Sequence, residues 1–184
     1  KAGTIILLST IFVWFAQGFG FEGGHFGMVE DMENSILAAI GSAIAWIFTP
    51  LGWGNWKAAV AAITGLVAKE NVVGTFGVLY GFGEVAEDGA EIWGSLAGSM
   101  TAVAAYSFLV FNLLCAPCFA AMGAIKREMN NAKWFWFAIG YQTLLAYVVS
   151  LCVYQIGTLI TTGAFGIGTV VALLLIIGFL YLLF

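Results

Sequence analysis

Two short segments of the sequence place reactive side chains inside long apolar stretches. In the first, Cys115 and Cys118 flank Ala116 and Pro117 within residues 92–125, a run of 34 residues without a charged side chain. Cysteine sulfur is a soft donor that suits transition-metal ions better than sodium or potassium. Proline breaks helices, and broken helices at membrane depth offer free carbonyl groups and helix ends to transported ions. The segment is therefore a candidate ion-pathway site.

Two other interpretations of this cysteine pair stay open. A C-x-x-C pattern also occurs in thiol–disulfide centres, although those centres lie in a soluble βα unit for which this sequence has no pattern. Cysteine is also a small hydrophobic residue that packs beside a proline kink without any chemical role. The third cysteine, Cys152, has no polar cluster near it in the sequence, so structural packing is its favoured interpretation.

The second segment is Lys69-Glu70, which lies halfway along the apolar residues 58–80 and precedes Asn71. An ionisable side chain inside a membrane is costly unless it faces a protein interior or water, so such residues are functional candidates. Neighbours in sequence do not face each other on a helix, so each charge needs a partner from another helix or from unwound backbone. We predict Glu70 in the ion pathway, with Lys69 and Asn71 as polar support. The alternative is that both charges only lock helices together.

His25 stands alone in an acidic, glycine-rich segment that also carries Glu22, Glu30, Asp31 and Glu33. Imidazole and carboxylate groups both bind divalent ions, so a weak external metal-collecting surface is one interpretation. A solvated acidic loop is the favoured one.

The elements that position these side chains belong in a membrane. Of the 184 residues, 62% are hydrophobic and only 9% are charged, whereas a soluble domain has about 25% charged residues. Such a chain cannot cover its surface with polar atoms, so we expect membrane lipid around it.

Several function classes are excluded by what the sequence lacks. The net charge of −4 leaves no basic surface for nucleic acid. The G-x-x-x-x-G-K-[ST], H-E-x-x-H and G-x-S-x-G motifs are all absent, so we expect no P-loop nucleotide site and no protease or hydrolase. The chain is predicted not to be an enzyme.

We predict an all-α membrane protein with about six transmembrane helices. The fourth apolar run would extend about 50 Å as one helix, too long for a single straight span, so it is expected to break at residues 115–118. The acidic segments 22–33 and 84–91 are predicted loops. The six apolar runs comprise residues 2–21, 35–51, 58–80, 92–125, 134–160 and 168–184.

The positions of the charges support six crossings and predict the orientation. With six spans, the acidic loops fall on one side of the membrane and nearly all lysine and arginine residues on the other. Because lysine and arginine favour the cytoplasmic side, both termini are expected in the cytoplasm. Among charges outside the spans only Glu128 departs from the pattern; the basic residues are Lys1, Lys57, Lys126, Arg127 and Lys133.

Three separated segments resemble the carboxy-terminal membrane region of the FeoB ferrous-iron transporter family. They are PLGWGNWK at residues 50–57, ITGLVAKENVV at 63–73 and NLLCAPCFAAM at 112–122, the last followed by AIKRE at 124–128. The opening KAGTII, running to Trp14, also resembles the helix that begins this half of the family's membrane domain. The resemblance covers nearly the whole chain.

The resemblance implies Fe²⁺ as the transported ion, and it implies that the chain is the second gate region of the membrane domain. The segment around Pro117 and Cys118 would then line the iron pathway across a bacterial inner membrane. The family's GTPase domain and earlier gate segment are missing, so any GTPase activity would reside outside this chain. We expect residues 1–184 to form one polytopic gate-type domain, a fragment of a longer transporter or a split subunit. Its partner would be the remaining half with the GTPase domain, or a second copy of this chain.

Two alternatives belong to other classes of function. The chain could be a gate-domain carrier of a non-metal solute, which would not need sulfur ligands. It could also be a structural half that scaffolds or dimerises around a partner carrying the pathway, in which case a water-accessible thiol at Cys118 is not expected.

Overall fold

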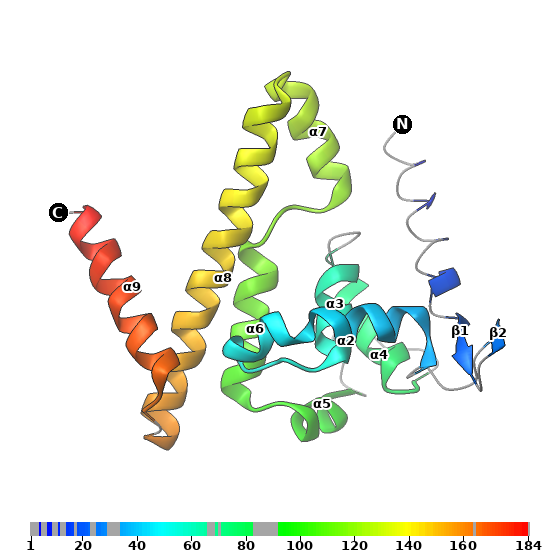
Figure 1. The fold of residues 1–184 in the computed structure, drawn as a ribbon, viewed down its shortest axis with the longest axis horizontal. Helices are drawn as coiled ribbons and strands as arrows, with labels where there is room; N and C mark the ends of the chain where they lie inside the picture. Colours follow the sequence, from blue (N-terminus) through cyan, green and yellow to red (C-terminus); the bar gives the residue numbers. More distant parts are fainter. Residues whose placement is uncertain are drawn as a thin grey trace.

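A computed structural model describes residues 4, 7–8, 11, 14–16, 18–22, 25–28, 34–65, 69, 71–82, 92–163 and 165–183. These residues are mostly helical (Figure 1). The predicted helical character of the chain is therefore confirmed.

Four helices near the carboxy terminus form the longest part of the molecule. α6 (Ala102–Leu114) and α7 (Phe119–Met129) follow one another along α8 (Ala132–Thr162), which runs in the opposite direction (Figure 1). α9 (Ile167–Leu183) then turns back beside α8. α6 and α8 make the most extensive contact between helices in the described part of the chain.

Side-chain caps fix where these helices begin. The Thr101 side chain accepts a hydrogen bond from the Ala104 N–H at 3.2 Å and so starts α6. The Asn131 side chain accepts from the Lys133 N–H at 3.0 Å and starts α8, directly after Asn130 reverses the chain in a left-handed conformation. Such caps supply partners for helix N–H groups that have none within the helix.

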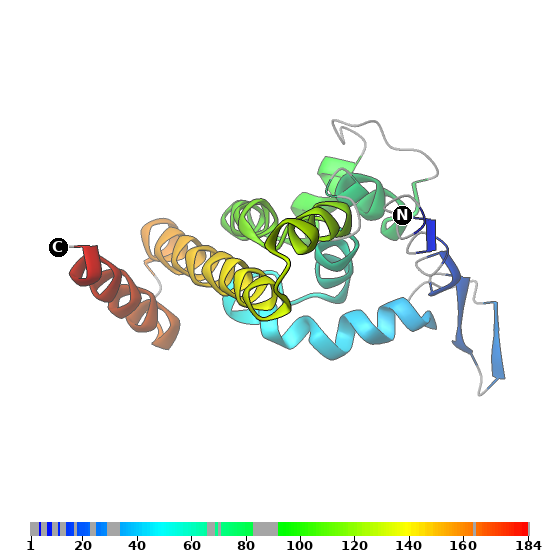
Figure 2. The same ribbon diagram turned by 90° about the horizontal axis from the view of Figure 1, so that it is seen from above.

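A second group of helices lies across this long part. α2 (Ile36–Phe48) continues into the short 3-10 helix η2 (Thr49–Leu51), and α3 (Trp56–Thr64) leaves it at a bend of 97°. α4 (Asn71–Leu79) packs against α3, and α5 (Trp93–Ser99) meets α6 at a bend of 104°. Figures 1 and 2 together show α2 running across the direction of α8.

The buried core lies where these two groups of helices meet. Trp53, which is only 1% exposed, stacks on Phe48 with ring centroids 4.3 Å apart. Phe108 of α6 makes an edge contact with the Trp53 ring at 5.1 Å, and Phe111 lies tilted against it at 5.4 Å. This aromatic cluster attaches the end of α2 and η2 to the middle of α6.

A short hairpin departs from the all-α prediction. β1 (Phe19–Glu22) and β2 (His25–Met28) pair antiparallel, with Phe19 opposite Met28. The sequence predicts a helix to residue 21 and a loop after it. Aromatic residues alternate with glycine on both sides of a Gly-Gly pair, a pattern typical of two-residue hairpins, and here it overrides the apolar run.

The predicted span at residues 58–80 is wrong as a single helix. The structure ends α3 at Thr64 and begins α4 at Asn71. The Oγ1 atoms of Thr64 and Thr75 lie 3.0 Å apart, and both side chains are buried between the two helices. A packed helix pair therefore takes the place of one continuous helix.

In the carboxy-terminal half, the predicted spans agree better with the helices of the structure. The predicted runs 134–160 and 168–184 correspond to α8 and α9, and the predicted break at residues 115–118 separates α6 from α7. Run 92–125 also contains a break that was not predicted, at the bend between α5 and α6.

Among the described residues, α8 is the one helix long and apolar enough to cross a membrane by itself. Up to three spans are present if α2–η2 with α3, and α5 with α6, each count as one bent span. The count of six crossings and the cytoplasmic position of both termini stay predictions.

Candidate functional site

The break between α6 and α7 is the centre of the candidate site. α6 ends after Leu114, and the backbone of Cys115 turns extended, with its N–H still bonded to the Phe111 carbonyl oxygen at 2.8 Å. The chain resumes as a helix after Cys118, whose carbonyl oxygen accepts from the Met122 N–H at 2.9 Å. Pro117 lies between them, where its missing N–H and fixed φ favour a helix start and not a helix interior.

Lys69 joins this break from a different part of the chain. The residue lies between α3 and α4, and its Nζ donates to the carbonyl oxygens of Asn112 at 2.7 Å and Leu113 at 3.3 Å. A third carbonyl, that of Cys115, lies at 3.5 Å. The last carbonyls of a helix have no partner within it and carry partial negative charge, so an ammonium group is well matched to them.

This contact gives Lys69 the partner that the sequence requires, unwound backbone at the end of another helix. It also corrects the expectation that the carbonyl groups at the break are free for an ion. Three of them already accept from Lys69.

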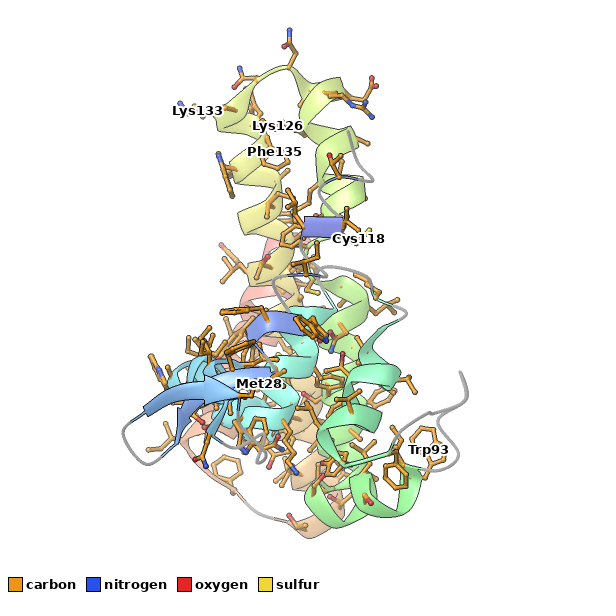
Figure 3. The ribbon with its side chains drawn as sticks, turned by 90° about the vertical axis from the view of Figure 1, so that its right-hand side faces the viewer. Met28, Trp93, Cys118, Lys126, Lys133 and Phe135 are labelled. Atoms are coloured by element: carbon orange, nitrogen blue, oxygen red, sulfur yellow. The ribbon has the colours of Figure 1, made fainter. Side chains whose placement is uncertain are left out.

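The two thiols at the break have different surroundings. Cys115 is only 7% exposed, and its Sγ contacts the carbonyl oxygens of Asn112 at 3.4 Å and Ala116 at 3.7 Å. Cys118 is half-buried and lies where the chain enters α7, at the end of that helix opposite to Lys126 (Figure 3). Cys118 is therefore the more accessible sulfur of the pair.

Cys152 lies away from this site. Its Sγ contacts the Ala172 carbonyl oxygen at 3.8 Å, between α8 and α9, and its side chain packs against the core. The structure thus places it in helix packing, as the sequence favours.

Other predicted site residues cannot be placed from the structure. Glu70 lies outside the described residues, as do the side chains of Asn71 and His25 and most of the acidic loops. In the part of the chain that is described, no three His, Cys, Asp or Glu side chains come together to hold a metal ion.

A buried polar cluster between α6 and α8 was not predicted from the sequence. Ser107 of α6 and Ser150 of α8 are fully buried, with their Oγ atoms 2.7 Å apart. Each Oγ also lies within hydrogen-bond distance of the other's backbone carbonyl oxygen, at 3.1 and 2.8 Å, and Ser107 Oγ lies 3.0 Å from the Leu51 carbonyl oxygen. Each hydroxyl has one proton to donate among these acceptors. The available signal was two small polar residues within long apolar runs, the residue types that bond helices together in membranes.

Carbonyl groups at the end of α2 and in η2 also receive hydrogen bonds from a distant helix. Tyr147 of α8 donates its hydroxyl to the Ile47 carbonyl oxygen at 2.7 Å, and Gln155 donates to the Pro50 carbonyl oxygen at 2.9 Å. In apolar surroundings an unpaired carbonyl has no water to bind, so such partners are needed wherever a helix stops. Lys69 performs the same task at the end of α6.

The family model described as "Gate: Nucleoside recognition" matches residues 1–132 of this chain. This range includes the α6–α7 break and Lys69. No solved structure matches the chain.

Curated relatives are Fe(2+) transporter FeoB proteins. The one from Methanocaldococcus jannaschii is 39% identical over 87% of this chain and 24% of its own length. The relative from Campylobacter jejuni is 34% identical over 82% of this chain and 25% of its own length. The relative from Staphylococcus aureus is 31% identical over 86% of this chain and 23% of its own length. The chain thus spans about a quarter of the length of these relatives, and the homology covers a membrane Gate segment and not the GTPase region.

Proposed function

This chain belongs to the Gate family and is homologous to part of the FeoB transporters, and from that premise we propose that it forms part of a pathway for Fe²⁺ across a cell membrane. The observation that carries the proposal is the α6–α7 break, where the half-buried Cys118 lies between two helices. Thiolate and thioether ligands select transition metals over the alkali and alkaline-earth ions that are more abundant in cells.

Cys118 is the proposed ligand for the ion during passage. It is more accessible than Cys115, whose sulfur is buried against backbone carbonyls. Pro117 keeps the chain out of the helical conformation at this point, and Glu70, next to Lys69 in the sequence, supplies a second ligand from the α3–α4 segment. The ion must also leave, so an open site with few protein ligands suits transport better than a closed cage.

The remaining parts of the transport system are proposed to lie outside this chain. A pathway at the surface of one half is completed by the other half, as in transporters whose sites lie between repeats. The partner is therefore the remainder of the transporter with its GTPase domain, or a second copy of this chain, within membrane lipid. The acidic segments raise the local cation concentration at the entrance, an effect that added salt weakens.

The experiment is Fe²⁺ uptake into vesicles that contain the full-length transporter. Cys118→Ser and Glu70→Gln are each expected to lower the uptake rate by about tenfold or more, since metal sites lose this much when a ligand or its support is changed. Cys152→Ser is the matched control, because that thiol packs between α8 and α9, and it is expected to transport as the wild type does. Unchanged uptake in both Cys118→Ser and Glu70→Gln would exclude this site.

One observation favours a second candidate, a carrier of a non-metal solute. The matching family model is described by nucleoside recognition and not by metal transport. Binding measured on the purified full-length protein separates the two functions. Saturable Fe²⁺ binding without nucleoside binding supports iron transport, and the reverse supports the carrier.

A further inference from the structure

The ammonium group of Lys69 occupies a position that a metal cation could otherwise take. Three backbone carbonyl oxygens, from Asn112, Leu113 and Cys115, surround its Nζ at 2.7, 3.3 and 3.5 Å. All three belong to the end of α6, three to six residues before Cys118. The carboxyl end of a helix carries roughly half a negative charge, which attracts any cation.

Carbonyl oxygens are hard ligands with little preference for transition metals. They coordinate calcium in protein loops and potassium in selectivity filters, where they replace the water of the ion. If these three oxygens were free, the broken helix would offer hard ligands beside a soft one. Such a mixed site would admit the abundant hard cations as well as a transition-metal ion.

We propose that Lys69 is a specificity-determining residue that withholds the α6 carbonyl oxygens from hard cations. Its ammonium group acts as a tethered cation that never leaves, so the sulfur of Cys118 becomes the distinguishing ligand at the break. This inference rests on the proposed function, because it concerns which ions the same site rejects.

The geometry explains why a lysine is suited to this task. An ammonium group has three donors and no acceptor, and it meets three carbonyl oxygens here. Lys69 is also held at its own backbone, where its carbonyl oxygen accepts from the Val72 N–H at 3.4 Å at the start of α4. The charge is therefore brought to α6 from a fixed point on a neighbouring helix pair.

The test measures Fe²⁺ uptake by the full-length transporter in vesicles with increasing Ca²⁺ on the same side. The wild type is expected to be insensitive to Ca²⁺. Lys69→Met frees the carbonyls, so Ca²⁺ should half-inhibit uptake at a concentration about tenfold or more below the highest one that leaves the wild type unaffected, a difference equivalent to about 1.4 kcal/mol of binding. Lys69→Arg should stay insensitive because its guanidinium can still donate to the carbonyls.

Lys126→Met is the matched control, since it removes a positive charge from the exposed end of α7 and should leave the Ca²⁺ response unchanged. Lys69→Gln removes the charge and shortens the side chain by one atom, so it should show the same Ca²⁺ sensitivity as Lys69→Met and serves if the methionine variant does not fold. The inference is overturned if Ca²⁺ inhibits the wild type as strongly as it inhibits Lys69→Met and Lys69→Gln. It is also overturned if uptake by both of these variants stays insensitive to Ca²⁺. A wild type that takes up no Fe²⁺ rejects the proposed function instead.

Discussion

The Nζ atom of Lys69 lies 2.7 Å from the carbonyl oxygen of Asn112, so a lysine between two short helices completes the end of a third. The end of α2 is completed in the same way, by Tyr147 and Gln155 of α8. Both interrupted helices thus obtain donors from segments far away in the sequence. Because each broken helix end needs such donors, the position of each break depends on which distant segment packs against it.

Loss of the Lys69 donor should destabilise the protein. Lys69→Met keeps much of the apolar side chain but leaves the carbonyls of Asn112, Leu113 and Cys115 without this partner. A buried acceptor that loses its donor costs about 1–3 kcal/mol, and the partial exposure of this contact favours the lower end. Unfolding in detergent, with Lys126→Met as the control, measures the difference. Equal stability of the two variants would contradict the capping role.

The Ser107–Ser150 contact should show measurable coupling between α6 and α8. The two Oγ atoms lie 2.7 Å apart, so either alanine variant removes the same side-chain contact. Hydrogen bonds between membrane helices have coupling energies that average about 0.6 kcal/mol and reach about 1.7. We expect a value in the upper part of this range, because both side chains are fully buried.

A double-mutant cycle of Ser107→Ala and Ser150→Ala, followed by unfolding in detergent, gives this coupling energy. Thr143→Ala is the matched control, since the Thr143 hydroxyl bonds only to its own helix, at the Ile139 carbonyl oxygen. Additive effects of the two serine variants would show that the Oγ–Oγ contact does not stabilise the helix pair.

The sequence was sufficient to predict the break at residues 115–118 and to identify Lys69 as a residue that needs a partner. Proline acts locally, so its effect on α6 and α7 is readable from the chain alone. A lysine in an apolar run is conspicuous for a similar reason, because its charge needs a partner in whatever fold the chain adopts.

The partner of Lys69 could not be predicted, because it depends on which helix end α3 and α4 approach. The division of residues 58–80 into two helices was missed because every residue around Lys69 and Glu70 is compatible with a helix. The hairpin of β1 and β2 was not predicted because residues 2–21 carry no charge and have the length of a membrane-spanning helix. Tertiary contacts decide the first two cases, and the local pattern around the Gly-Gly pair decides the third.

The turn after η2 should not tolerate a side chain at Gly52. The residue has φ +88, and a Cβ there would collide with the ring of Tyr154. Gly163, at the end of α8, is the matched control because it has φ +67 but open space around it. The left-handed backbone costs about 1–2 kcal/mol for alanine at either position. Gly52→Ala should lower the free energy of unfolding more than Gly163→Ala does.

Removal of the ring separates the two contributions at Gly52. Adding Tyr154→Ala to Gly52→Ala relieves the collision, so the remaining cost of the glycine change, measured against Tyr154→Ala alone, should equal that of Gly163→Ala. If the cost at Gly52 stays the same with and without the ring, the backbone conformation alone explains it and the steric account is wrong.

Accessibility of the thiols should differ within the Cys115–Cys118 pair. Cys115 is buried with its sulfur against the carbonyl oxygens of Asn112 and Ala116, and its modification requires local opening of the break. Cys118 is half-buried at the start of α7 and needs no such opening. We expect Cys118 to react faster with a small water-soluble maleimide by at least about tenfold, equivalent to about 1.4 kcal/mol of opening free energy.

Single-cysteine variants of the full-length protein in vesicles provide the measurement. Cys152, which packs between α8 and α9, serves as the reference for a thiol that faces apolar surroundings. Fe²⁺ should slow the labelling of Cys118 and leave that of Cys152 unchanged, because only the former is proposed to bind the ion. If Cys118 resists the water-soluble reagent from both sides of the membrane, the broken helix lines no aqueous pathway, and the scaffold role becomes the better account of this chain.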